Sequence, residues 1–562
     1  MTAAVLAGCG GGSDSSSTSG GATNNISPPS PPPAVATPTI SGKITYDSVP
    51  TTASTSGSTG GLDYSKTTQL PVSHALVELV SSDGATILGN TTTDDTGAYT
   101  LNAPSGKPGY VRVTAQAFEG PASTPDYTIK VRDNTAPEYS ASPDTAPLYS
   151  MRGSVFTPTT GVTKLDLNAG SGWTGANYGG ARTAAPFAIL DQTVNAARQL
   201  HRAEPGVALP ALNIFWSINN RPTSGDANSG FITTSHYQRA DQSKGLYILG
   251  AEDVDTDEYD SSVIVHEFGH YVEANLSRSD SIGGDHSAAN MLDIRVAFGE
   301  GFGNAFSSMM RGTPVYTDTA GARQSVLSVS LHLDQVPPAD AKSWANEAAV
   351  GNFLYSASQS ADIGFAPLYH ALLNGERTTP ALTSAFSFAT ALRPALTDAG
   401  KSKLDALLGD IAVQGGSQLD AWGTQTKSSG DPGGDNSAAV PVYLPLTVGQ
   451  SITACVTTEY GTDNKLGVYR HLRVTVPAAG AYQFTTVPAA RDESVNDFGV
   501  IVYSQGKPLL NLTSTSSTVS TYVFPAAGVY AADMMSARAL DSSTETAPMS
   551  YCANVLMKTA NP

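Results

Sequence analysis

The sequence has little charge, few cysteines and no long apolar run. Charged residues are 14% of the 562 positions, well below the usual quarter. Lys and Arg number 31 against 49 Asp and Glu, a formal net charge of −18. A nucleic-acid partner requires clustered cations, and no window of the chain supplies them. No run of 18 apolar residues occurs, so we expect no membrane-spanning helix.

Small polar residues take the place of charge. The chain contains 54 glycines and 35 prolines, and Ser, Thr and Asn supply much of its polarity. This composition indicates a protein rich in loops and strands that functions outside the cytoplasm. At roughly 100–200 residues per domain, the length predicts three or four domains.

Three cysteines are too few for a disulfide scaffold. Cys455 and Cys552 could pair in an oxidising compartment; the alternative is two buried thiols. Cys9 ends the tetrapeptide LAGC, and residues 10–38 are mostly Gly, Ser, Thr and Pro, which cannot form a core. The tetrapeptide resembles a bacterial lipobox, at which a signal peptide is cleaved and the cysteine acylated. This resemblance implies a lipid anchor at Cys9, a disordered tether over 1–38 and a place in the bacterial cell envelope, at the outer membrane, in the periplasm or at the cell surface.

Residues 39–135 have the pattern of a small β-domain. Residues 40–46 alternate at period two, as a half-buried strand does. The other expected strands are 77–80, 91–103 and 110–115, separated by turns. The order of these strands, with 71–79 and 93–101 carrying the likeness, resembles the carboxypeptidase regulatory-like, transthyretin-type β-sandwich. The resemblance implies a spacer or appendage without chemistry of its own.

Residues 440–562 form the second strand-rich segment. Residues 476–482 (VPAAGAY) and 524–530 (FPAAGVY) are near copies, each a strand that ends at a Pro/Gly turn and starts again. With residues 497–503 between them, they resemble the β-sandwich domains found at the C-terminus of secreted bacterial peptidases.

The segment 150–430 between them combines strands with helices. The expected elements are a helix over 185–203, strands over 212–216 and 246–249, and helices over 262–275, 301–311, 347–358, 367–373 and 404–414. A few strands followed by a helical lobe is an α+β arrangement. The predicted fold is therefore multidomain, with an α+β domain flanked by two β-sandwiches.

The motif HEFGH at residues 266–270 carries the chemistry. On a helix, residues four apart share a face, so His266 and His270 can present two imidazoles to one ion, with Glu267 beside them. This is the HExxH arrangement of zinc metalloproteases. A chance five-residue match is the alternative, against which the apolar residues 263–265 and a downstream third ligand both count.

A third ligand decides the type of zinc site. The metzincin positions beyond His270 hold Glu273 and Leu276, so that pattern fails. Glu273 lies on the same expected helix, and one straight helix cannot surround an ion, so we expect a solvated or outer carboxylate. Residues 298–306 (FGEGFGNAF) place Glu300 at the start of a second helix. Together with HExxH this resembles the gluzincins, which include thermolysin and the zinc aminopeptidases.

The gluzincin resemblance implies a set of roles. Glu300 would be the third ligand of Zn²⁺, and Asn304, one helical turn on, would accept a hydrogen bond from a zinc histidine. Glu267 would act as general base on a water molecule and return the proton to the leaving amine. The oxyanion must also be stabilised, and the candidates are Tyr355, His370 and His286. The strand 246–249 is a candidate edge for an extended peptide substrate.

Residues 252–260 place six carboxylates in nine positions. The favoured interpretation is a solvated acidic loop near the positive N-terminus of the zinc helix. The alternative is a Ca²⁺ site that braces this loop, although no EF-hand spacing is present.

Taken together, the sequence predicts a lipid-anchored zinc metallopeptidase that acts on protein or peptide substrates. One rival is a non-catalytic surface-binding lipoprotein with a vestigial metal site, against which the intact Glu267 argues. The other is a peptidase specialised for glycosylated proteins. The substrate preference and the oligomeric state cannot be predicted from the sequence.

Overall fold

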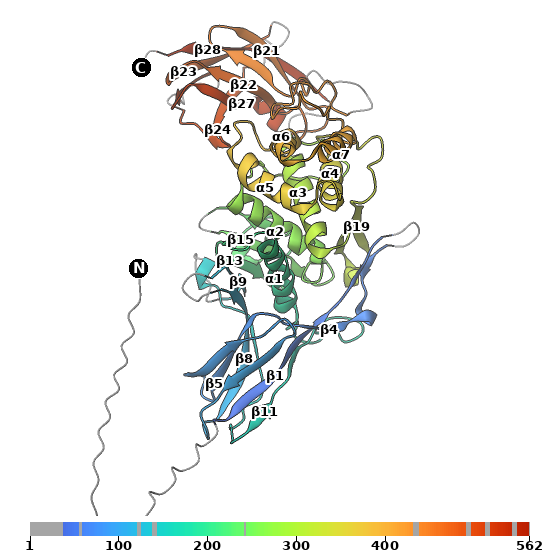
Figure 1. Cartoon of the computed structure of the whole chain (residues 1–562), viewed down its shortest axis with the longest axis vertical. Coiled ribbons are helices and arrows are strands. Elements are labelled where there is room, and N and C mark those ends of the chain that lie inside the picture. The colour runs from blue at the N-terminus through green and yellow to red at the C-terminus, as the bar shows by residue number, and fades with distance from the viewer. Residues whose placement is uncertain are drawn as a thin grey trace, which may run out of the picture.

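The computed structural model describes residues 37–54, 59–120, 125–137, 143–240, 243–430, 438–489, 496–511, 518–541 and 548–560. Three parts stack along the longest axis: N-terminal strands, a central part of sheet and helices, and C-terminal strands (Figure 1). The protein is thus multidomain, with several β-sheets and with helices in its centre. Cys9 lies outside the described residues, so the lipid anchor stays a prediction. Within those ranges, no helix is long and apolar enough to cross a membrane.

The N-terminal part consists of two sheets that share a core. In the first sheet, the central strand β1 pairs with β4, β7, β11 and β12. In the second sheet, β5 pairs with β6 and β8, and β8 also pairs with β10. The bounds are β1 Thr39–Ser48, β4 Thr68–Pro71, β5 Ala75–Ser81, β6 Ile87–Thr92, β7 Ala98–Asn102, β8 Gly109–Glu119, β10 Ser150–Arg152, β11 Val162–Lys164 and β12 Leu167–Ala169. Alternate residues of β1, such as Ile44 and Tyr46, are fully buried in this core. A short hairpin of β2 (Thr51–Thr52) and β3 (Gly61–Leu62) projects from β1.

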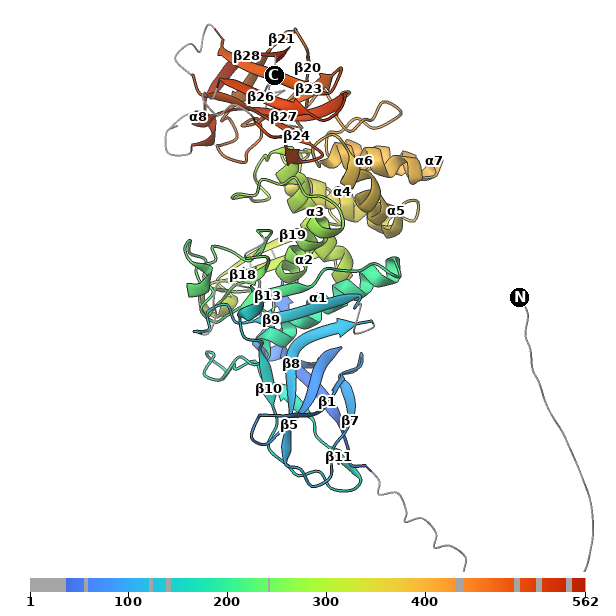
Figure 2. The same ribbon diagram turned by 90° about the vertical axis from the view of Figure 1, so that its left-hand side faces the viewer.

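The second sheet continues without a break into the central part. Strand β9 (Tyr127–Arg132) pairs with β8 on one side and in parallel with β13 (Leu212–Trp216) on the other. Figure 2 shows β8 leading from the N-terminal strands toward β9 and α1. The expected division between 39–135 and 150–430 therefore does not separate two sheets, because backbone hydrogen bonds cross it. Residues 150–169 supply three strands of the N-terminal part.

Helices cover the central sheet and form a lobe beyond it. Helix α1 (Ala185–Ala203) packs on β9, α2 on α1, and α3 on both α2 and α4. The remaining bounds are α2 Ser261–Leu276, α3 Ile294–Arg311, α4 Glu347–Gln359, α5 Phe365–His370, α6 Ala385–Leu392 and α7 Asp398–Gly409. The short strands of this part are β14 His236–Gln238, β15 Gly245–Ile248, β16 Gly250–Ala251, β17 Asp255–Thr256, β18 Val315–Ala320 and β19 Leu327–His332. Observed helix α1 coincides with the helix that the apolar spacing predicts.

The C-terminal part is two packed sheets around a core of its own. One has the order β20-β22-β27-β24-β25 and the other β21-β28-β23-β26. The bounds are β20 Leu444–Thr447, β21 Ser451–Thr457, β22 Arg470–Val476, β23 Gly480–Pro488, β24 Phe498–Ser504, β25 Lys507–Pro508, β26 Val519–Phe524, β27 Gly528–Ser536 and β28 Ser550–Thr559, with a short helix α8 Ala537–Leu540.

The two near-copy phrases have the same local structure. Each contains the turn at which the chain crosses from one sheet to the other, between β22 and β23 and between β26 and β27. In the first, the Tyr482 hydroxyl donates to Ala478 O; in the second, Tyr530 donates to Ala526 O. Similar sequence therefore marks a similar crossing between the sheets.

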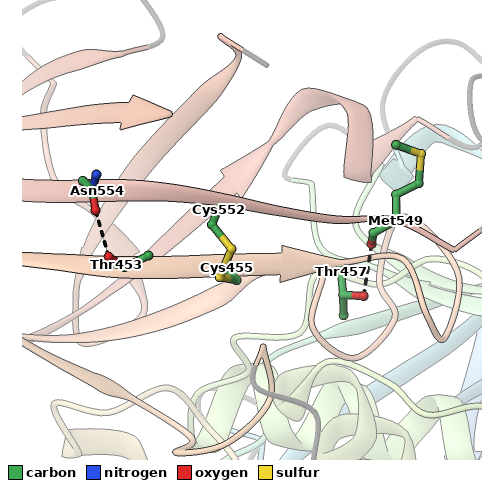
Figure 3. The surroundings of a disulfide bond; sticks show 6 residues. All are labelled: Thr453, Cys455, Thr457, Met549, Cys552 and Asn554. Carbon is green, nitrogen blue, oxygen red and sulfur yellow. Dashed lines mark hydrogen bonds between the residues drawn. A yellow bond between two sulfur atoms is a disulfide. The ribbon is translucent and has the colours of Figure 1, made fainter. Parts of the chain in front are cut away.

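A disulfide joins Cys455 of β21 to Cys552 of β28. The two residues are directly opposite each other in an antiparallel pair of strands, and they are flanked by hydrogen bonds from Thr453 to Asn554 and from Thr457 to Met549 O (Figure 3). Of the two alternatives that the sequence leaves open, the structure has the bridge. It links positions 97 residues apart.

Candidate functional site

The HExxH motif lies on a buried face of α2. His266 and His270 are on the same side of the helix, with ring centroids 4.7 Å apart. His266 and Glu267 are only 5% and 8% exposed, and His270 is half-buried. The apolar residues 263–265 hold the start of this helix in the core. Two imidazoles and a carboxylate are thus fixed at the base of a cleft.

Glu300 of α3 faces both imidazoles. Its Oε2 lies 3.2 Å from His266 Nε2 and 3.2 Å from His270 Nε2. Potential ligand atoms of His266, Glu267 and His270 also lie within 4.8 Å of one another. The two carboxylates come from different helices, and Glu300 is the one in direct contact with both rings.

Glu300 does not open its helix, contrary to the expectation. Helix α3 begins at Ile294, where the Asp293 carboxylate accepts a hydrogen bond from the backbone N–H of Arg295 and caps the first turn. The glycines at 299, 301 and 303 obscure this start in the sequence, because glycine is a poor helix former. Glu300 therefore projects from the second turn of a helix that packing on α2 and α4 stabilises.

Asn304 contacts the back of the first imidazole. Its Oδ1 lies 3.0 Å from His266 Nδ1. An amide oxygen only accepts hydrogen bonds, so Nδ1 carries a proton. Nε2, the nitrogen that faces Glu300, donates to that carboxylate here and would present its lone pair to a metal once deprotonated. This is the tautomer that a metal requires.

Glycines allow the helices to approach this closely. A Cβ on Gly303 would lie 2.7 Å from Cε1 of the His266 ring, and one on Gly301 would lie 2.7 Å from Cβ of Val350 on α4. On α2, a Cβ on Gly269 would lie 3.1 Å from the Phe306 ring. Gly301 and Gly303 are therefore packing requirements of the site.

A third histidine reaches the same carboxylate from the loop between α2 and α3. His286 Nε2 lies 3.3 Å from Glu300 Oε2, and His286 Nδ1 lies 2.6 Å from Glu347 Oε2. Because the Glu347 carboxylate accepts from Nδ1, the Nε2 side of His286 faces the cleft. Of the three candidates for oxyanion stabilisation, this is the one that the structure brings to the motif.

The charges of the site are strongly coupled. Burial would raise the pKa of Glu300, but the charge of His270 and hydrogen bonds from His266 and His270 hold that pKa well below its usual range. Burial lowers the pKa of His270, yet the Glu300 carboxylate outweighs it and raises this pKa to about 9. Burial likewise opposes a raised pKa at His286, where the hydrogen bond to Glu347 brings the value to about 9. The pocket is thus arranged for a cation between the carboxylates.

These residues line a cleft of about 600 Å³. The cleft is also lined by His236 and Tyr237 of β14, and by Tyr316, Val329 and Leu331 of β18 and β19. The strand expected as the substrate edge, 246–249, forms most of β15 and is internal, because it pairs with β13 on one side and β14 on the other. Within the described residues, the edge of the sheet at the cleft is β14.

The C-terminal part holds the loop that carries His286. Asn464 Nδ2 donates to Gly283 O at 2.8 Å, and Lys465 Nζ donates to Asp285 O at 2.6 Å. A Cβ on Gly284 would lie 2.8 Å from the Asn464 amide. The C-terminal sandwich is therefore in direct contact with one wall of the site.

Three other predicted candidates lie elsewhere or differ from the expectation. Tyr355 is buried in α4 and His370 is exposed at the end of α5, and neither lines the cleft. Glu273 is 1% exposed, so it is not solvated, and burial raises its pKa to about 7. The hydrogen bonds of His266 and His270 go to Glu300 and not to Glu273.

Two functional candidates have no signal in the sequence. Tyr316 of β18 lines the cleft, its ring centroid is 5.8 Å from that of His266, and burial raises its pKa well above the usual value, so its hydroxyl remains a donor. Glu347 begins α4 and orients His286. Both are brought to the motif by tertiary packing, and neither lies in a recognisable motif of its own.

Replacing Asn304 by alanine is expected to weaken zinc binding about 10–100-fold, the usual cost of removing a partner of a metal histidine. The cause would be loss of the hydrogen bond that fixes the His266 tautomer. Asn304→Asp retains an acceptor and should bind within a few-fold of the wild type. Competition titration with a zinc chelator measures both. Equal affinities for Asn304→Ala and wild type would show that this contact does not orient a ligand.

Comparisons with known proteins assign no family. No protein-family model matches the chain, and no curated protein matches it. Among solved structures, a crystal structure of a 9R-lipoxygenase from Cyanothece PCC8801 is similar over 33% of this chain and 27% of its own, with 10% identity and a TM-score of 0.14. The match spans about a quarter of the lipoxygenase, and at this TM-score it carries no argument about fold or function.

Proposed function

We propose that this protein is a zinc-dependent peptidase with a zincin-like central domain of the gluzincin type. The observation that carries the proposal is the convergence of three side chains: Glu300 Oε2 lies 3.2 Å from His266 Nε2 and 3.2 Å from His270 Nε2. Two imidazoles and one carboxylate from two helices form a donor set that catalytic zinc uses, with one position left for water or substrate. The tautomer imposed by Asn304 fits the same ion.

His266, His270 and Glu300 would hold the zinc. When bound there, zinc would lower the pKa of a water molecule and polarise the scissile carbonyl. Glu267, the next residue after His266, takes the proton from the attacking water and delivers it to the leaving nitrogen. No nucleophilic serine or cysteine is needed for this reaction.

The walls of the cleft supply the other requirements. Tyr316 and His286 are the donors available to the developing oxyanion. The exposed edge of β14 offers backbone hydrogen bonds to an extended peptide, which would add a strand to the sheet. The substrate is accordingly a protein or peptide segment in extended conformation, and anchoring through Cys9 would place the enzyme at the cell envelope.

Replacing Glu267 by glutamine tests the proposal. We expect one zinc per chain in both proteins, and a value of kcat/KM for casein about 10²–10⁴-fold lower in the variant, the usual contribution of a general base. Glu273→Gln, a buried carboxylate on the same helix, serves as the matched control and should cleave at a rate similar to the wild type.

The outcome separates the proposed function from its rivals. A metal-free wild type that cleaves nothing would support the non-catalytic binding protein. Cleavage of a glycosylated protein but not of its deglycosylated form would support the specialised peptidase. Equal activities of wild type and Glu267→Gln would contradict the proposed role of Glu267.

A further inference from the structure

Three aspartates beside the proposed zinc site converge on a second point. Asp255 of β17, Asp257 just after it and Asp318 of β18 each offer a carboxylate oxygen, and these oxygens lie within 4.8 Å of one another. We call these residues the aspartate triad. All three line the same cleft as His266 and Glu267. The first two belong to the acidic loop noted in the sequence, and the third comes from 61 residues further along the chain.

Within the triad, Asp257 is buried and Asp255 and Asp318 are half-buried. Asp257 is 2% exposed, and although Ser235 donates to its Oδ2, its Oδ1 has no hydrogen-bond donor among the described residues. Oδ1 of Asp255 and Oδ1 of the fully buried Asp260 also have none there. In the described part of the chain, no ion pair joins Asp255, Asp257, Asp260 or Asp318 to a Lys or Arg.

Poor solvation and mutual repulsion raise the pKa of all three carboxyl groups. Burial together with the charge of Asp318 raises the pKa of Asp255 to about 7. Burial and the charges of Asp255 and Asp318 raise the pKa of Asp257 well above its usual range. Burial raises the pKa of Asp318 to about 6. Carboxylates that are crowded together and poorly solvated in this way must be protonated or must face a cation.

We infer that Asp255, Asp257 and Asp318 bind a divalent, oxygen-preferring cation, and that Ca²⁺ is the ion that fits best. The donors are all carboxylate oxygens, which suit hard cations and not the nitrogen and sulfur preference of zinc. Ca²⁺ accepts variable coordination from carboxylates, whereas Mg²⁺ demands near-ideal octahedral geometry and keeps most of its water. The Oδ1 atoms of Asp255 and Asp257, which lack hydrogen-bond donors among the described residues, have lone pairs available to coordinate such an ion.

This cation would join two segments that frame the proposed active site. Asp255 and Asp257 lie in the segment that leads into α2, and Asp318 shares a face of β18 with Tyr316, two residues before it. Binding would therefore fix Tyr316 and the start of the HExxH helix relative to each other. Cation binding by the aspartate triad does not depend on the proposed peptidase activity.

Equilibrium dialysis of the full chain against Ca²⁺ tests the inference. Concentrations up to about 10 mM exceed the dissociation constants of about 10⁻⁴–10⁻³ M typical of extracellular calcium modules. We expect one Ca²⁺ per chain, an affinity at least about 10-fold weaker in Asp257→Asn and in Asp318→Asn, and an unchanged affinity in Asp253→Asn. Asp253 belongs to the same loop, but it is exposed, and its carboxylate accepts a hydrogen bond from the backbone N–H of Arg323. It is therefore the matched control.

Thermal unfolding gives a second measurement with the same proteins. Ca²⁺ should raise the Tm of the wild type and of Asp253→Asn, because a ligand that binds the folded state stabilises it. The Tm of Asp257→Asn should not respond to Ca²⁺, and without Ca²⁺ it should equal or exceed that of the wild type, because the substitution removes repulsion.

The controls separate this site from the zinc site. His266→Ala/His270→Ala, which removes two proposed zinc ligands, should still bind Ca²⁺. Loss of Ca²⁺ binding in that variant alone would place the ion at the histidines and overturn the inference. Absence of Ca²⁺ binding by the wild type would overturn it too. The explanation of the cluster would then be a proton shared by Asp255 and Asp257. A third outcome would also overturn the inference: Asp318→Asn keeps full Ca²⁺ affinity but no longer cleaves after Lys or Arg. The triad would then be a substrate subsite for a basic side chain.

Discussion

Replacing Glu300 by alanine is expected to abolish stoichiometric zinc binding and, with it, peptidase activity. Glu300 Oε2 contacts both His266 Nε2 and His270 Nε2 at 3.2 Å, so its removal leaves two imidazoles on one helix to hold the ion. The loss of affinity should exceed the roughly 10–100-fold that follows removal of a hydrogen-bonding partner of a ligand. Metal analysis of the protein after dialysis against a weak chelator measures it.

Glu273→Ala is the control for this result. Glu273 is 1% exposed against 6% for Glu300 and lies on α2 itself, but the carboxylate that contacts both imidazoles is that of Glu300. Its variant should keep most of its zinc. The reverse outcome, with zinc lost from Glu273→Ala and kept by Glu300→Ala, would reject the gluzincin assignment while leaving a metal site at the two histidines.

Replacing Arg295 by methionine is expected to lower the free energy of unfolding by about 3–5 kcal/mol, the usual cost of breaking a buried ion pair. Arg295 of α3 is 1% exposed, and it pairs with Asp293 and with Asp533 of β27, each at 2.8 Å. His471 of β22 contacts the same Asp533 at 2.7 Å. Urea unfolding of the full chain measures the change.

This network matters because α3 also carries Glu300, five residues after Arg295. The C-terminal sandwich is thereby attached to the helix of the third ligand, and we expect Arg295→Met to weaken zinc binding as well as stability. Lys401→Met removes an exposed ion pair with Asp398, and exposed pairs contribute about 0–1 kcal/mol. If Arg295→Met changed stability no more than Lys401→Met, the network would not hold the two parts together.

Features that depend on residues close together in the chain, such as helices and turns, could be predicted from the sequence. The apolar spacing of residues 185–203 predicts α1, and the four-residue spacing of His266 and His270 predicts their shared face. The one helical turn between Glu300 and Asn304 predicts only that they share a helix face; their place at the motif is what the resemblance to the gluzincins implies. The two turns that connect the sheets of the C-terminal sandwich likewise lie within the short similar segments 476–482 and 524–530.

Features that depend on tertiary pairing could not be predicted in this way. Strand β15 has the apolar composition of a sheet interior, but only its pairing with β14 shows that it is not the edge. The continuity of the sheet through β9 depends on hydrogen bonds to β13, about 85 residues away. Tyr316, Glu347 and Asp318 lie in segments without a motif, and packing alone brings them to the cleft.

Anomalous diffraction from crystals of the full chain, recorded on both sides of the zinc absorption edge, tests the central claim most directly. The account predicts one peak bounded by His266 Nε2, His270 Nε2 and a Glu300 oxygen, about 2.0–2.1 Å from the nitrogens and about 2.0–2.2 Å from the oxygen. A zinc-supplemented crystal with no peak at this point, or with its peak beside Glu273 and Glu300 turned away, would contradict it.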